Sequence, residues 1–144
     1  MVAEGITRFG EPMSERGVAF RCAECGEVAA TVRLQPREGP VNMGPPLGYQ
    51  RQPRDGAVLD GFLGTVWHAI ERLTYDEMAW FVAQERPDAA WLRAKDWQLA
   101  PFYCRHCELN YCRADWHPQV RFDEGFYDCT VGHCPRGHQQ TIDD

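Results

Sequence analysis

The sequence predicts an α+β fold in which small β-hairpins near the two ends of the chain flank an inserted segment of two or three short helices. Three observations support this prediction. Cysteine and histidine pairs lie in short turns near both ends, residues 18–34 alternate between apolar and polar positions, and residues 57–97 carry apolar residues at helical spacing. At 144 residues the chain matches the size of one domain, so we expect a single domain over 1–144.

The segment 18–34 is typical of a strand, a tight turn and a second strand. Apolar residues 18–20 lead into the turn Cys22-Ala23-Glu24-Cys25, and alternate apolar positions follow over 28–34. Gly26 suits the positive φ that such a turn often needs. The last part of the chain, 98–142, returns to short alternating stretches broken by Cys, His, Gly and Pro, which predicts small hairpins around metal.

Residues 35–56 hold five prolines and repeated glycines. This composition opposes a regular ladder or helix, and we expect a long loop that is either mobile or ordered by a partner. The loop is basic and contains one aromatic residue, Tyr49. Its candidate partner contacts are Arg37, Tyr49, Arg51 and Arg54.

The middle segment 57–97 is predicted to be helical. Apolar residues from Leu59 to Leu73 recur at intervals of three and four, although each glycine inside such a helix costs about 1 kcal/mol relative to alanine. Thr74 followed by Glu77 forms a capping-box pattern, and Pro87-Asp88 is a typical start for a further helix.

Three turns each offer two metal ligands: Cys22 with Cys25, Cys104 with Cys107, and Cys134 with His138. A two-residue gap lets both thiolates converge on one ion, and zinc prefers tetrahedral sulfur and nitrogen ligands. Cys112 and His117 add a fourth pair, and Cys129 is a further possible ligand. We therefore expect two zinc ions, bound by eight residues. The candidate ligands are Cys22, Cys25, Cys104, Cys107, Cys112, His117, Cys134 and His138.

These turns resemble those of the zinc-ribbon and treble-clef group of zinc fingers, in which one knuckle lies between two strands and a second completes the site. The resemblance covers residues 18–34 and 98–142 and implies structural zinc, often with an interaction or nucleic-acid role. The helical segment 57–97 and the loop 35–56 would then be an insertion between the two knuckles.

The sequence allows two ways of dividing the ligands between the two metal sites. In a sequential division, Cys22 and Cys25 join Cys104 and Cys107, and the later ligands form the second site with His117 or Cys129. In an interleaved division, similar to a RING-type cross-brace, Cys22 and Cys25 join Cys112 and His117, whereas Cys104 and Cys107 join the pair at 134 and 138. The sequential division is slightly favoured, because Phe20-Arg21-Cys22 and Phe102-Tyr103-Cys104 both lead a strand into a knuckle.

The composition narrows the function classes. A formal net charge of −6 opposes general attraction to nucleic acid, and we find no phosphate-binding, metalloprotease, deaminase or hydrolase motif. The sequence has neither an export signal nor an apolar run of membrane-spanning length, so we expect a cytoplasmic protein. In the reducing cytoplasm seven cysteines are more readily explained by metal binding than by disulfides. The first hypothesis is therefore a structural zinc protein that acts as a protein-interaction or accessory subunit and not as an enzyme. A nucleic-acid-binding zinc ribbon and a metalloenzyme with an open zinc site are the alternatives.

Overall fold

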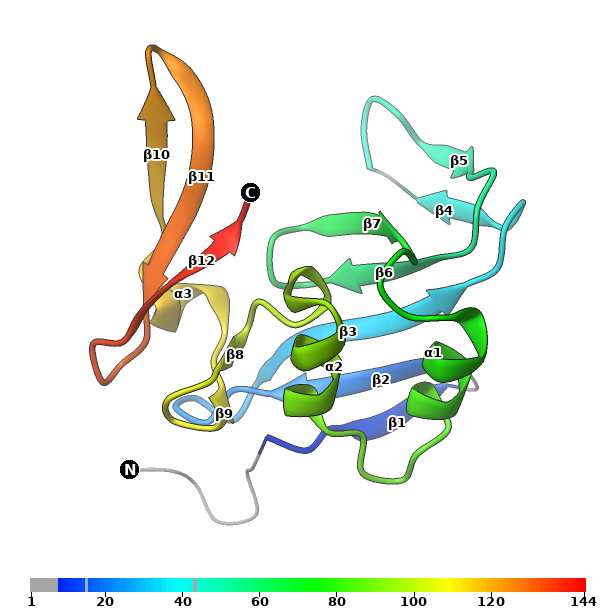
Figure 1. The fold of residues 1–144 in the computed structure, drawn as a ribbon, viewed down its shortest axis with the longest axis horizontal. Coiled ribbons are helices and arrows are strands. Elements are labelled where there is room, and N and C mark those ends of the chain that lie inside the picture. The colour runs from blue at the N-terminus through cyan, green and yellow to red at the C-terminus, as the bar shows by residue number, and fades with distance from the viewer. Residues whose placement is uncertain (1–7, 15, 43) are drawn as a thin grey trace.

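The computed structural model describes residues 8–14, 16–42 and 44–144, and its largest element is an antiparallel sheet (Figure 1). Each strand of this sheet pairs antiparallel with the next. The sequence prediction of strand, turn and strand over 18–34 is confirmed by the second and third strands. The strand order is β1 (Glu11–Ser14), β2 (Gly17–Arg21), β3 (Val28–Gln35), β6 (Gly56–Asp60) and β7 (Thr65–Ala69).

The helix expected at the start of the middle segment is wrong, because β6 and β7 form a hairpin there. The turn between them has positive φ at Gly61 (90°) and Gly64 (74°), and the Gly61 N–H donates to the Gly64 carbonyl over 3.0 Å. Glycine adopts positive φ without steric cost, whereas it weakens a helix interior. The two glycines therefore favour the hairpin over the helix, and β6, whose residues 57–59 are buried, lies between β3 and the edge strand β7.

The later helices of the middle segment are confirmed. Helix α1 (Tyr75–Val82) begins after Thr74, whose side chain accepts the Glu77 N–H while the Glu77 carboxylate accepts the Thr74 N–H. Helix α2 (Ala89–Lys95) begins after Asp88, and the short 3₁₀ helix η1 (Trp97–Leu99) follows. Both α-helices cover one face of the large sheet (Figure 1).

Aromatic rings connect this helix–sheet layer to the C-terminal part of the chain. Phe81 of α1 stacks on Phe20 of β2 with ring centroids 6.4 Å apart, and Phe102 lies 5.0 Å from Phe20 and 6.2 Å from Phe62. All four side chains are fully buried. One hydrophobic cluster therefore holds the start of the C-terminal part against the sheet.

The segment 35–56 contains a short hairpin of β4 (Pro40–Asn42) and β5 (Tyr49–Arg51), so the expectation that it forms no regular ladder is wrong. In a two-stranded ladder every strand is an edge strand. Proline, which lacks an N–H, is tolerated at such edges, and Pro40 opens β4 without preventing the pairing.

The C-terminal part forms the small hairpins that the sequence predicts for 98–142. Its strands β10 and β11 make a hairpin that projects from the body of the molecule (Figure 1). Over the described residues, no helix is both long and apolar enough to cross a membrane. The elements are β8 (Tyr103–Cys104), β9 (Leu109–Asn110), α3 (Arg113–Trp116), β10 (Gln119–Asp123), β11 (Phe126–His133) and β12 (Gln139–Asp143).

Candidate metal centres

The two CxxC turns share one backbone geometry. The Gly26 N–H donates to the Cys22 carbonyl over 2.9 Å, and the Glu108 N–H donates to the Cys104 carbonyl over 2.8 Å. Both donor residues have positive φ, 78° at Gly26 and 57° at Glu108. Glutamate adopts this conformation only at some steric cost. The second turn therefore has the same shape as the first, although no glycine marks it in the sequence.

The third turn joins β11 to β12 and carries Cys134 and His138. The Gly137 N–H donates to the Cys134 carbonyl over 2.8 Å, and the Cys134 N–H donates to the His138 carbonyl over 3.0 Å. Gly137 has φ of 88°, which glycine accommodates easily. The closed turn places the thiol and the imidazole on the same side of the hairpin end.

One group of four ligands, the Cys₃His cluster, consists of Cys104, Cys107, Cys134 and His138. The His138 Nδ1 atom lies 3.3 Å from the Sγ atoms of both Cys107 and Cys134 and 3.7 Å from that of Cys104. The Cys107 and Cys134 sulfurs are 3.7 Å apart. The four donor atoms therefore surround one point and could hold a metal ion.

A second group, the Cys₃Asp cluster, consists of Cys22, Cys25, Cys112 and Asp115. Asp115 Oδ2 lies 3.1 Å from the Sγ atoms of both Cys22 and Cys112, and the Cys25 and Cys112 sulfurs are 4.0 Å apart. Helix α3 positions two of these ligands, because Cys112 is its N-cap and Asp115 lies in its first turn. Cys22 is buried and Cys25 is exposed, so this cluster opens to solvent on one side.

The sequential division of ligands that the sequence slightly favours is not the arrangement in the structure. Cys22 and Cys25 lie with Cys112, as in the interleaved division, and not with the pair at 104 and 107. His117, the C-cap of α3, lies outside this cluster. His117 is exposed, ends the helix with a left-handed φ of 48°, and is replaced in the cluster by Asp115.

Sequence reasoning did not find Asp115. The available signal was its spacing, since Cys112-x-x-Asp115 has the same two-residue gap as a CxxC pair. Cys129, the reserve ligand, lies in β11 outside both clusters. His106 stacks on His138 with ring centroids 4.9 Å apart and lies outside the Cys₃His cluster.

Burial is the largest single influence on the pKa of four of the cluster thiols. It raises the pKa of Cys22, raises that of Cys104 to about 12, and, together with the hydrogen bond to Asp115, raises that of Cys112 to about 12. For Cys134, burial acts upward but hydrogen bonds from the backbone N–H groups of His138 and Arg136, followed by the neighbouring thiols, lower the pKa overall. A bound divalent cation reverses such upward shifts by stabilising the thiolates directly.

Hydrogen bonds connect the segments that carry the two clusters. The Ala23 N–H, within the first turn, donates to the carbonyl of Asn110 in β9 over 2.8 Å. The fully buried Trp116 of α3 donates its indole N–H to the Phe102 carbonyl over 3.2 Å. The two groups of ligands therefore lie on one packed unit that also contacts the central core.

The candidate partner contacts of segment 35–56 are partly engaged within the chain. Arg54 forms an ion pair with Glu71 at 3.2 Å, and the Arg51 guanidinium donates to the Glu38 carbonyl over 2.6 Å. The Arg37 backbone N–H, and not its side chain, donates to Asp55 over 2.9 Å, and Tyr49 is 73% exposed.

The comparisons with known proteins give one match. A family model described as a domain of unknown function (DUF8328) matches residues 13–144. No curated protein and no solved structure matches the chain significantly.

Proposed function

The chain belongs to the DUF8328 family, and because the family's description assigns no activity, we propose from its own residues that it is a structural zinc-binding protein. Two zinc ions, one in the Cys₃His cluster and one in the Cys₃Asp cluster, hold its fold together. On that framework it acts as a protein-interaction or accessory subunit.

The observation that carries this proposal is the spacing of the Cys₃His donors. A tetrahedral zinc ion with Zn–S bonds of about 2.3 Å and Zn–N bonds of about 2.0 Å holds sulfurs about 3.8 Å apart and sulfur and nitrogen about 3.5 Å apart. The Cys107–Cys134 separation is 3.7 Å, and the three distances to His138 Nδ1 span 3.3–3.7 Å. The turns therefore hold the donors at zinc-binding distances.

The ligand types support zinc over iron. Mononuclear iron–sulfur sites use four thiolates, whereas each cluster here has three cysteines and one harder ligand. Zinc accepts sulfur, nitrogen and oxygen ligands in one tetrahedral site. A four-ligand site is closed to substrate, which supports a structural role over a catalytic one.

Zinc would stabilise this chain by joining distant segments. The Cys₃Asp cluster connects the turn after β2 to α3, and the Cys₃His cluster connects the β8–β9 turn to the β11–β12 turn. A structural zinc site contributes on the order of 10 kcal/mol to folding in small modules, whereas a whole domain is stable by only about 5–15 kcal/mol. Loss of either ion is therefore expected to unfold much of the molecule.

Elemental analysis and thermal melting test the proposal. The purified protein should contain close to two zinc ions per chain. Cys104→Ser and Cys134→Ser should each lose zinc together with melting temperature and cooperativity. Cys129→Ser is the matched control, because Cys129 lies outside both clusters and should keep two ions. Zinc near zero, iron in its place, or a variant that loses one zinc with an unchanged melting temperature would contradict the structural role.

The interaction role is supported by the β10–β11 hairpin. Four apolar side chains on it are exposed, with Phe126 at 77% and Phe122 at 68%. Isolated exposed apolar residues are ordinary, but a group of them marks interaction surfaces. Residues 119–129 also carry three acidic side chains and one arginine. The occupant that fits this surface is a protein with an apolar patch and a basic rim. The exposed residues are Val120, Phe122, Phe126 and Tyr127.

Crosslinking followed by reconstitution tests this surface. A photoreactive residue at position 126 should capture one protein other than this chain, and the purified pair should bind. The double variant Phe122→Ser with Phe126→Ser should abolish the complex while it keeps both zinc ions. Trp80→Ser, at a 53% exposed position on α1, should leave the complex intact. Capture of nucleic acid or of a second copy in place of a partner, or a complex insensitive to the double variant, would refute the proposed occupant.

A further inference from the structure

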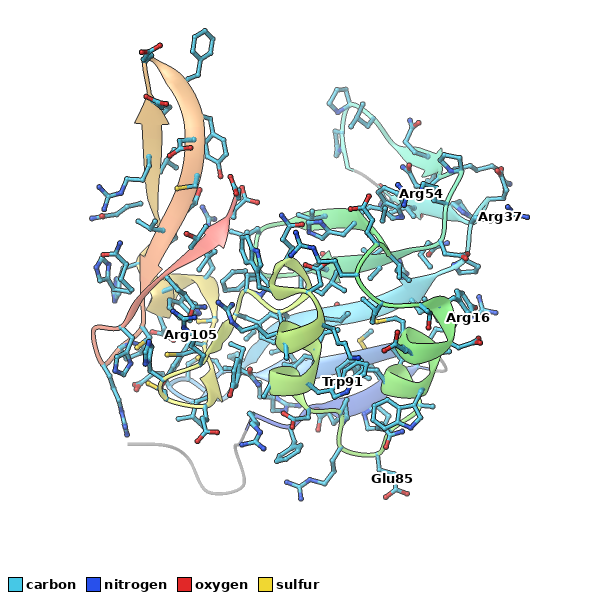
Figure 2. All side chains as sticks on the ribbon, viewed as in Figure 1. Arg16, Arg37, Arg54, Glu85, Trp91 and Arg105 are labelled. Atoms are coloured by element: carbon cyan, nitrogen blue, oxygen red, sulfur yellow. The ribbon has the colours of Figure 1, made fainter. Side chains whose placement is uncertain are left out.

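Two adjoining hollows lie between α2, the β8–β9 turn and β12, and their lining residues include none of the eight residues of the two clusters. They have volumes of about 470 and 480 Å³ and share Arg93, Trp97 and Arg105 as lining residues. Small-molecule sites commonly measure about 300–1,000 Å³. Arg105 lies where the β8–β9 turn meets the C-terminal strands (Figure 2).

The two arginines in these hollows, Arg93 and Arg105, form no ion pair with any part of the chain that the structure describes. The Arg93 Nη1 atom is buried and has no hydrogen-bond partner. Leaving a buried donor unpaired is unfavourable, and more so when the group is charged. Burial and the neighbouring charge of Arg105 also lower the pKa of Arg93, which is the direction expected for a cation that lacks an anion.

We propose that Arg93 and Arg105 bind the phosphate group of a small phosphorylated molecule. Guanidinium groups donate parallel hydrogen bonds to phosphate oxygens, and two arginines from different elements can take different oxygens of one tetrahedral anion. Trp97 lines both hollows and Tyr103 lines one of them, and these rings supply apolar surface for the body of that molecule.

The surroundings favour a compact ligand over a nucleic-acid strand. Asp144 lines one of the two hollows, and its carboxylate would repel a polyanion that continued beyond the arginines. The net charge of −6 acts in the same direction. Two guanidinium groups are enough to bind one phosphate, so the site should select a single phosphate group.

The site adjoins the Cys₃His cluster through the chain itself. Arg105 lies between the ligands Cys104 and Cys107, and Gln139, another lining residue, follows His138. If that cluster holds zinc as proposed, metal loss should disorder Arg105 and weaken phosphate binding. Zinc content must therefore be measured in every variant, so that a lost metal is distinguished from a lost anion site.

Calorimetry and thermal melting test the proposal with three probes at matched ionic strength: inorganic phosphate, phenyl phosphate and benzoate. Phenyl phosphate should bind saturably and raise the melting temperature. Arg93→Gln and Arg105→Gln should each weaken its binding at least 10-fold. Arg136→Gln, an exposed arginine in the β11–β12 turn, is the matched control and should bind as wild type does.

A second variant separates ligand binding from folding. Arg93→Met keeps most of the apolar stem but removes the unpaired charge, so it should raise the melting temperature without ligand and abolish the response to phenyl phosphate. Tighter binding of inorganic phosphate than of phenyl phosphate would show that the apolar walls do not contact the ligand and would overturn the small-molecule assignment. Absence of saturable binding, tighter binding of benzoate, or equal weakening by Arg136→Gln would overturn the site itself.

Discussion

Gly132 in β11 offers a test of how tightly α3 is held, because it carries no functional group and binds no metal. A Cβ atom at this position would lie 2.8 Å from the Trp116 carbonyl oxygen and 3.2 Å from the Trp116 Cβ. Trp116 is fully buried and hydrogen-bonded to Phe102, so it cannot turn away. Gly132→Ala must therefore shift the backbone of α3.

Overpacking of this kind costs about 1–3 kcal/mol. For a chain of 144 residues this corresponds to a fall in melting temperature on the order of 3–10 °C. The shift should also move Asp115, whose Oδ2 lies 3.1 Å from two thiols. We expect Gly132→Ala to release one zinc ion to a chromogenic chelator faster than wild type, while the Cys₃His cluster keeps its ion.

Gly125→Ala separates a general loss of stability from this local effect. Gly125 has φ of 84° and no atom within 4 Å of an added Cβ, so alanine there is strained without a collision. The strain costs roughly 1–2 kcal/mol, but the β10–β11 turn is remote from both clusters. The control should melt at a lower temperature and retain two zinc ions. A Gly132→Ala protein with wild-type melting and metal release would refute the argument.

Three further outcomes are expected. Thr74→Ala should reduce the free energy of unfolding by about 1 kcal/mol in urea titration, because it removes the N-cap of α1, whereas Thr74→Ser should retain it. Hydrogen bonds from Lys95 and the Thr74 N–H lower the pKa of Glu77 from 4.5 in the folded protein. The ionised Glu77 carboxylate therefore stabilises the folded state above pH 4.5, and this contribution is lost as the pH falls through the folded-state pKa. The difference in melting temperature between wild type and Glu77→Gln should narrow as the pH falls below 4.5, and a constant difference would contradict the assignment. Limited trypsin digestion should cut within 35–56 first, and survival of that segment as long as the β8–β9 turn would count against its role as a docking loop.

Local signals in the sequence predicted those elements that depend on neighbouring residues alone. The capping box of Thr74 and Glu77, the Asp88 start of α2 and the two strands around Cys22 are all set within a few residues. The segment 57–73 was mispredicted because its apolar spacing fits a helix and a hairpin alike. Its place in the sheet depends on pairing with β3, which lies more than twenty residues earlier in the chain.

The residues that meet in the two clusters were predicted more completely than their grouping. CxxC spacing identifies a chelating turn, but which turns meet is decided by tertiary packing. Phe102 packs on Phe20 and so brings the β8–β9 turn beside the first turn without merging their thiols. His117 was the predicted ligand and Asp115 was not considered, whereas the single helical turn of α3 places Asp115 in the cluster.

The interleaving of the two clusters has a consequence for the order of events during synthesis. Cys25 and Cys112 are separated by 87 positions, whereas Cys104 and His138 are separated by 34. At about 5–20 residues per second, the first cysteine pair waits roughly 4–17 s on the ribosome before its partners are made. During that interval the two thiols lack the other members of their cluster, and they could be oxidised or bind the wrong ion. If the two clusters hold metal as proposed, faithful loading would therefore depend on the cell keeping the nascent chain reduced until its last third has emerged.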